Sequence, residues 1–146
     1  MSANADRIER FLINLEWPHE RLDETLWRTL YQGDLQLHEI FISADEDGCV
    51  SFRSRVCGAP KAESTLTVYR HLLRLNSLIP LTKFCIAASG DVFALLDLPT
   101  QDIVQDEFRA ALTAIVNHVD HYDNEIIALC EDPARRSSFE DPVAST

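Results

Sequence analysis

The sequence has 146 residues, of which 46% are hydrophobic and 25% are charged. This length and balance fit one globular domain, and they exclude a disordered chain and a protein built of apolar membrane spans. The 13 basic and 24 acidic residues give a formal net charge of −11. The acid is concentrated toward the two ends, and no basic cluster is larger than Arg135-Arg136. Nucleic acid and anionic membrane surfaces are therefore poor partners, and a partner with a basic face is favoured.

The four cysteines are spaced 8, 28 and 45 positions apart. This spacing matches neither the Cys-x-x-Cys pairs of zinc sites nor a small disulfide framework. The N-terminal sequence MSANADRIER carries charges where a signal peptide needs an apolar run. We therefore expect a cytoplasmic chain with reduced, buried cysteines and with no metal or other cofactor.

In the first half, apolar residues at helical spacing predict a helix over residues 5–16. Residues 22–31 are ambiguous, because leucines recur at helical spacing while residues 27–31 are rich in β-branched and aromatic types; we expect a strand. Gly33-Asp34 predicts a two-residue turn into a second strand over 35–43. A further turn over 45–48 leads to a third strand over 49–56. Apolar and polar residues alternate in this third strand, so one face of the sheet is covered and the other faces water.

In the second half, residues 64–79 predict a helix with a wide apolar surface, and Ser89-Gly90 joins two strands over 81–88 and 91–98. After Pro99, apolar residues at steps of three and four predict a helix of about 26 residues, roughly 39 Å long. Such a helix either covers its own sheet along its whole length or packs partly on another subunit. The sequence does not distinguish these two alternatives. We expect residues 1–131 to form one domain and residues 132–146 to form a flexible C-terminal tail.

No catalytic motif is found in the sequence. The glycines are isolated in turns, which excludes the phosphate-cradling motifs, and no serine lies in a Gly-x-Ser-x-Gly turn. On the last predicted helix His118, His121 and Glu125 lie within about 60° of one another and could share a zinc or nickel ion. Because they supply only three ligands, we favour a solvated or interface-edge cluster over a metal-dependent enzyme that uses His118 and His121.

A family resemblance rests on motifs of the second half. A helix ends in Leu-Asn at residues 75–76, Pro80-Leu81 starts a strand, a turn follows at 89–91, and a second strand closes in Leu-Pro before the long helix. In this order the motifs, over about residues 66–129, resemble the YbjN family and the related class I type III secretion chaperones. The resemblance implies an α+β fold, an antiparallel sheet with helices in the order α-β-β-β-α-β-β-α. It also implies an acidic homodimer that binds other proteins.

The secretion chaperones hold an extended effector segment, whereas YbjN-type proteins are described as regulators of sensory or stress signalling. We therefore expect a non-catalytic protein-binding module, chaperone-like or a regulatory adaptor, that acts as a homodimer. Its partner would be a protein or an extended peptide segment with apolar anchors and basic flanks. A small-ligand sensory domain is the alternative, and it would need a deep apolar pocket between sheet and helices.

Two sets of residues are assigned to these contacts. The partner is expected on the exposed parts of the first three strands, at Trp27, Tyr31, Phe41 and Phe52. Aromatic residues at strand spacing also suit a core, and this alternative stays open. The dimer contact is expected on the last helix, at Ile115, Val119, Tyr122 and Ile126.

Overall fold

The computed structural model describes residues 3–45 and 48–140. It has three α-helices and six strands in this part of the chain: α1 (Ala3–Asn14), β1 (Glu20–Asp23), β2 (Leu26–Gln32), β3 (Leu37–Ala44), β4 (Cys49–Cys57), α2 (Thr65–Leu78), β5 (Lys83–Ile86), β6 (Val92–Pro99) and α3 (Gln105–Glu131). A single 3-10 turn (Ala62–Ser64) precedes α2.

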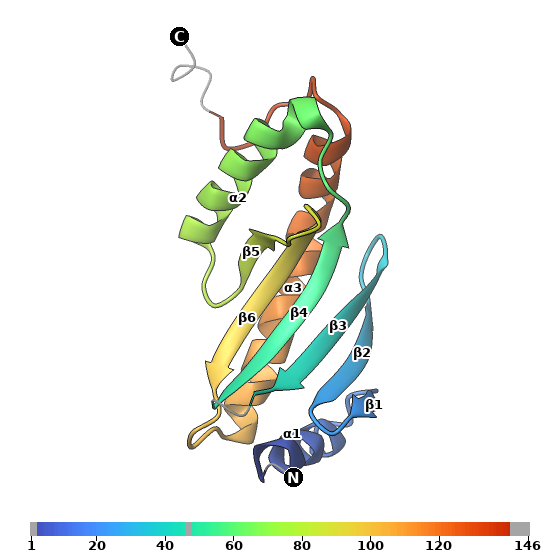
Figure 1. Ribbon diagram of the computed structural model, residues 1–146, viewed down its shortest axis with the longest axis vertical. Coiled ribbons are helices and arrows are strands. Elements are labelled where there is room, and N and C mark those ends of the chain that lie inside the picture. The colour runs from blue at the N-terminus through green and yellow to red at the C-terminus, as the bar shows by residue number, and fades with distance from the viewer. Residues whose placement is uncertain (1–2, 46–47, 141–146) are drawn as a thin grey trace.

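All six strands form one antiparallel sheet in the order β1-β2-β3-β4-β6-β5. Helix α3 lies along one face of the sheet, α1 lies at the end where β2 begins, and α2 lies at the opposite end beside β5 (Figure 1). The predicted α+β class with an antiparallel sheet is therefore confirmed. The element order differs from the expected one only by β1, a short additional strand before β2.

The core lies between the sheet and α3. Residues that alternate along each strand point to this covered face, and those of β3, β4 and β6 are almost fully buried: Ile40, Ile42, Val50, Phe52, Ala94 and Leu96. The ring of Phe108 on α3 joins the layers, because its centroid lies 5.4 Å from that of Phe52 and 5.5 Å from that of Phe11 on α1. Period-two burial on the strands and a continuous apolar stripe on the helix thus meet in one core.

The turns differ from the predicted ones. The connection from β2 to β3 spans residues 33–36, closed by a hydrogen bond from the Gly33 amide to the Gln36 carbonyl, instead of the two residues expected. Strand β5 is also shorter than predicted, since residues 87–91 form the turn into β6. Gly90 has a φ of 91° in this turn, which explains why glycine occupies it. Residues 46 and 47 of the predicted turn over 45–48 lie outside the described residues.

The C-terminal end of α3 runs past the sheet and packs against α2, as Figure 1 shows. Residues that follow α3 then fold back onto this pair of helices. The Ser137 hydroxyl lies 2.7 Å from Nδ1 of the buried His71 on α2, the Ser138 amide donates to the Glu125 carboxylate at 2.7 Å, and the Phe139 ring lies 4.8 Å from the His71 ring. Residues 137–139 of the expected tail therefore contact the domain, whereas residues 132–136 are exposed. Residues 141–146 lie outside the described residues.

Candidate functional site

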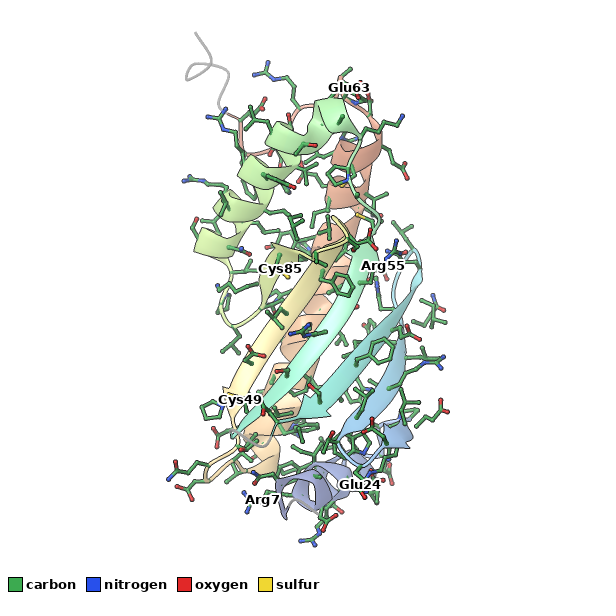
Figure 2. The ribbon with its side chains drawn as sticks, in the orientation of Figure 1. Arg7, Glu24, Cys49, Arg55, Glu63 and Cys85 are labelled. Atoms are coloured by element: carbon green, nitrogen blue, oxygen red, sulfur yellow. The ribbon has the colours of Figure 1, made fainter. Side chains whose placement is uncertain are left out.

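The open face of the sheet is the candidate binding surface. One row of outward-facing side chains crosses five strands from β2 to β5, each residue paired in register with the next: Arg28, Phe41, Arg53, Leu95 and Lys83. Basic and apolar side chains alternate along this basic–apolar row. Figure 2 looks onto this face, on which Cys85 and Arg55 are labelled. The row is basic although the whole chain has a net charge of −11.

The three basic side chains of the row differ in whether they already have a partner within the chain. Arg28 forms ion pairs with Glu39 at 2.7 Å and Glu20 at 3.6 Å. Lys83 Nζ donates to the Ile79 carbonyl at the end of α2. Arg53 is exposed and makes no hydrogen bond or ion pair with another described residue. Its guanidinium is therefore the row's free site for a carboxylate, which it can bind with two parallel hydrogen bonds.

A hollow of about 230 Å³ lies next to Arg53, lined by Arg53, Cys85, Ile86, Ala87, Phe93, Ala94 and Leu95. Burial raises the pKa of the Cys85 thiol, although Arg53 opposes this effect, so the thiol stays protonated at neutral pH and is a poor nucleophile. The volume is below the roughly 300–1,000 Å³ typical of small-molecule sites. The hollow suits one apolar side chain of a partner, next to a carboxylate bound by Arg53. It lies on the open face of the sheet, whereas the small-ligand alternative would need a pocket between the sheet and the helices.

The four aromatic residues expected to bind a partner occupy different environments. Trp27 and Phe52 have no exposed surface and belong to the core. The Trp27 indole N–H donates to the Glu9 carboxylate on α1, so its one polar atom is satisfied inside the molecule. Tyr31 is half-buried on the covered face, and Phe41 is half-buried in the basic–apolar row. Trp27 and Phe52 therefore take the core alternative. Of the four aromatic residues, Phe41 is the one on the open face, and its contact with a partner remains a proposal.

The residues of α3 expected at a dimer contact are covered by their own chain. Ile115, Val119 and Ile126 have no exposed surface, because the sheet and the other two helices pack against α3. Tyr122 is partly exposed, and its ring packs edge-on against Phe84 and His121. Of the four residues expected at a dimer contact, Tyr122 alone keeps exposed surface.

Helix α2 has a second apolar face that the core does not use. Val68, Leu72 and Leu75 point into the core. On the opposite side, three side chains at spacings of three and four form the α2 stripe, and their exposed fractions are 67%, 40% and 71%: Leu66, Tyr69 and Leu73. Large apolar side chains grouped on one helix face mark an interaction surface, whereas scattered ones do not.

The three residues of α3 that were weighed as possible metal ligands make separate contacts. Nδ1 of His118 lies 2.7 Å from the Thr82 hydroxyl, and Glu125 holds Ser138. Burial lowers the pKa of His118, and the neighbouring His121 and Lys83 act in the same direction, so its imidazole is neutral at pH 7. His121 is exposed. His118, His121 and Glu125 therefore serve separate contacts.

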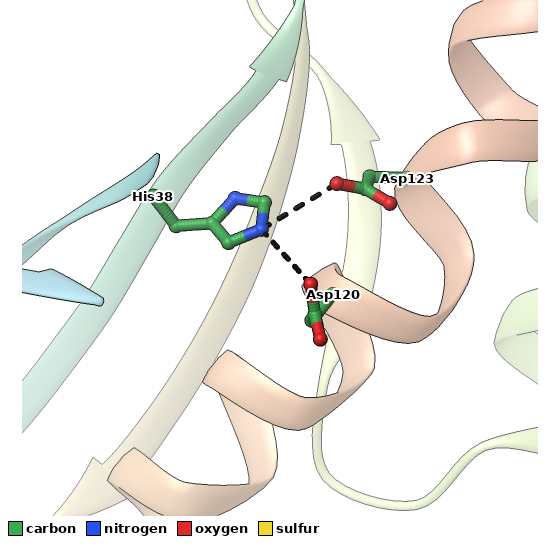
Figure 3. A group of neighbouring side chains, drawn as sticks. All are labelled: His38, Asp120 and Asp123. Carbon is green, nitrogen blue, oxygen red and sulfur yellow. Dashed lines mark ion pairs between the residues drawn. The ribbon is translucent and has the colours of Figure 1, made fainter. Parts of the chain in front are cut away.

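Another histidine meets carboxylates of α3 instead. His38 on β3 points its Nε2 between Asp120 and Asp123, as Figure 3 shows, with the nearest carboxylate oxygens at 3.6 and 3.4 Å. The side chains of His38 and Asp123 are 2% and 1% exposed. Among the described residues this is the one group of at least three His, Cys, Asp or Glu side chains with metal-compatible spacing. Spacing along the chain could not reveal it, because His38 lies 82 positions before Asp120.

No described helix is both long and apolar enough to cross a membrane. Among the described residues that line the hollow, Cys85 is the one nucleophile, and no histidine or carboxylate lines the hollow with it.

Comparisons with solved structures agree with this architecture. A chain of the Yersinia pestis type III secretion chaperone SycH in complex with a fragment of YscM2 is 15% identical, with a TM-score of 0.54 and coverage of 80% of this chain and 97% of that chain. A chain of the ExoU–SpcU complex of Pseudomonas aeruginosa is 17% identical, with a TM-score of 0.60 and coverage of 84% and 97%. YbjN from E. coli is 12% identical, with a TM-score of 0.61 and coverage of 82% and 90%.

At these identities the similarity establishes the fold alone. None of the curated proteins matches the sequence. A family model does match, over residues 4–128, and its description is "Putative bacterial sensory transduction regulator". The match spans α1 and all six strands and ends inside α3. The chain therefore belongs to the YbjN family.

Proposed function

We propose that this chain is a non-catalytic protein-binding module, a chaperone-like or regulatory adaptor that works in the cytoplasm as a homodimer. The observation that carries the proposal is the basic–apolar row on the open face of the sheet, which no described element of the chain covers. Support comes from similar solved structures, since SycH is in complex with a fragment of YscM2 and SpcU with ExoU. The family description as a sensory transduction regulator agrees with an adaptor.

The row specifies the partner's chemistry. Phe41 and Leu95 offer apolar contacts on either side of Arg53, and the hollow beside Arg53 accepts one more apolar side chain. An extended segment with apolar anchors and an acidic residue between them fits this pattern. Basic flanks, expected from the net charge of −11, would lie outside the row against the acidic remainder of the surface.

Charge reversal on the row tests the partner proposal. Fluorescence anisotropy would measure the binding of labelled peptides with apolar anchors, one set with a central acidic residue and one with a central basic residue. We expect the acidic set to bind and Arg53→Glu to weaken it at least 10-fold, because the variant opposes the carboxylate. The matched control is Arg10→Glu, an exposed arginine on α1. If Arg53→Glu and Arg10→Glu bound the acidic peptides equally well, or if only the basic peptides bound to the wild type, a partner on this row would be contradicted.

The homodimer is proposed through the α2 stripe. Ile115, Val119 and Ile126 are enclosed in their own chain, whereas Leu66 and Leu73 are each more than 60% exposed. Burying such leucines against a second copy stabilises a dimer by roughly 1.5–3 kcal/mol for each side chain fully removed from water. Two copies of one helix face meet naturally about a two-fold axis.

Sedimentation equilibrium tests the dimer. We expect the wild-type chain to sediment as a dimer and Leu73→Glu as a monomer with unchanged far-UV circular dichroism. Leu35→Glu is the matched control, since Leu35 is 64% exposed in the loop between β2 and β3 and lies outside the stripe. A wild-type monomer, or a Leu73→Glu dimer, would exclude this contact.

A further inference from the structure

We propose that His38, Asp120 and Asp123 bind one divalent transition-metal ion of the zinc class. The three side chains come from β3 and from successive turns of α3, and Figure 3 shows the His38 Nε2 aimed between the two carboxylates. Imidazole with carboxylate ligands is a donor set that suits zinc, whereas magnesium and calcium favour oxygen ligands alone. The site is separate from the basic–apolar row, because His38 points to the covered face of the sheet.

The distances fit an ion better than they fit direct hydrogen bonds. Nε2 of His38 lies 3.6 Å from Asp120 Oδ1 and 3.4 Å from Asp123 Oδ2, which is too long for an N–H···O bond. Two ligands of a tetrahedral zinc ion, each about 2.0–2.1 Å from the metal, lie about 3.3–3.4 Å from one another. All three ligand atoms lie within 4.8 Å of one another, so small side-chain rotations complete the shell.

Buried atoms of the cluster lack partners within the described chain. Nε2 of His38 and Oδ1 of Asp123 are buried and form no hydrogen bond there. A buried polar atom without a partner costs about 1–3 kcal/mol, and a charged one costs more. A protonated imidazole would supply one positive charge for two carboxylates, and no described lysine or arginine forms an ion pair with Asp120 or Asp123. A divalent ion with a neutral imidazole balances both carboxylates.

The loop between β2 and β3 positions the carboxylates. Gln36 Nε2 donates to Asp123 Oδ2 at 2.8 Å, and the Asp34 amide donates to Asp120 Oδ1 at 2.9 Å. Contacts of this kind orient metal ligands. The backbone of Gly33 lies directly against the ligand atoms, because a Cβ at this position would be 2.1 Å from Asp120 Oδ1 and 2.7 Å from His38 Nε2. Asp120 is 18% exposed, so the site is open to solvent on the side of this carboxylate, from which an ion can enter.

Zinc binding by protein purified without a His tag and treated with EDTA tests the site. Equilibrium dialysis with elemental analysis should give one zinc per chain, and zinc should raise the Tm of the wild type. Changes to metal-orienting neighbours alone cost 10–100-fold in affinity, so loss of a ligand in His38→Asn or Asp120→Asn should cost about 100-fold or more. Asp120→Asn is the safer variant for folding, because Asp120 is partly exposed and the substitution keeps its shape.

Two further variants separate this site from others. His121→Asn changes an exposed histidine beside Asp120 and should bind zinc like the wild type. Cys57→Ser removes one of two thiols whose sulfur atoms lie 3.7 Å apart, the other group that could attract zinc, and it should also leave binding intact. A wild type that holds no zinc, folded Asp120→Asn that binds like the wild type, or loss of zinc in Cys57→Ser would each overturn the proposal.

Discussion

The two faces of the sheet use the same strands for different purposes. On the covered face, side chains such as Phe52 have no exposed surface and contact α3, and the indole of Trp27 satisfies its only donor with Glu9 of α1. On the open face, Phe41 is half-buried between two arginines. Residues one position apart in a strand therefore differ in whether they hold the fold together or remain available to another molecule, and chemical type alone does not distinguish them.

Truncating one phenylalanine on each face tests the comparison most strongly. Phe52→Ala removes a ring that contacts Phe108 inside the core, and we expect a loss of about 3–5 kcal/mol in the free energy of unfolding. Phe41→Ala removes a half-buried ring and should cost less than about 1.5 kcal/mol. Urea denaturation followed by circular dichroism measures both values. Equal losses would show that the open face is as tightly packed in solution as the covered one.

A polar contact of the covered face should give an effect that depends on pH. Burial alone would raise the pKa of the Glu9 carboxyl, but hydrogen bonds from Trp27 and His19 outweigh burial and hold the pKa below its usual value of 4.5. The fold thus favours the carboxylate, so this stabilisation is present above pH 4.5 and is lost as the pH falls through the folded-state pKa.

Glu9→Gln should therefore cost about 2 kcal/mol at pH 7, because a neutral amide replaces an acceptor of charge-assisted hydrogen bonds. Denaturation of the wild type and the variant at a series of pH values checks this. The difference between them should shrink below pH 4.5. A difference that stays constant through the acid range would mean that the Glu9 charge does not stabilise the Trp27 contact.

Much of the fold could be predicted, because periodicity is a local property. The helices and five of the six strands follow from apolar spacing of period 3.6 or 2. Strand β1 was missed since its four residues, Glu-Arg-Leu-Asp, are all exposed and show no alternation. The contacts of Ser137 and Ser138 were missed because their partners, His71 and Glu125, meet them only in the folded chain.

The site was predicted less completely, because it depends on which strand face each residue occupies and on contacts between distant elements. The alternation of β4 already placed Phe52 with Val50 on the covered face, and pairing of Phe41 with Arg53 places Phe41 opposite. His38 gave no signal of its own, since its carboxylate neighbours are on α3. The apolar α2 residues were recognised as a wide surface, but only the packed fold shows that two separate faces exist.

The smallest effect is expected for an ion pair of the open face. Arg28→Gln breaks contacts of 2.7 Å with Glu39 and 3.6 Å with Glu20. All three side chains are more than 35% exposed, so water and salt screen their charges, and the loss should be about 0.5 kcal/mol or less. Urea denaturation at low salt and at about 1 M salt measures it, and the difference from the wild type should vanish at high salt. Arg10→Gln on α1 is the control for loss of an exposed charge. A salt-independent loss as large as that of Glu9→Gln would show that the arginine is desolvated, and hence that a second molecule already covers the open face in solution.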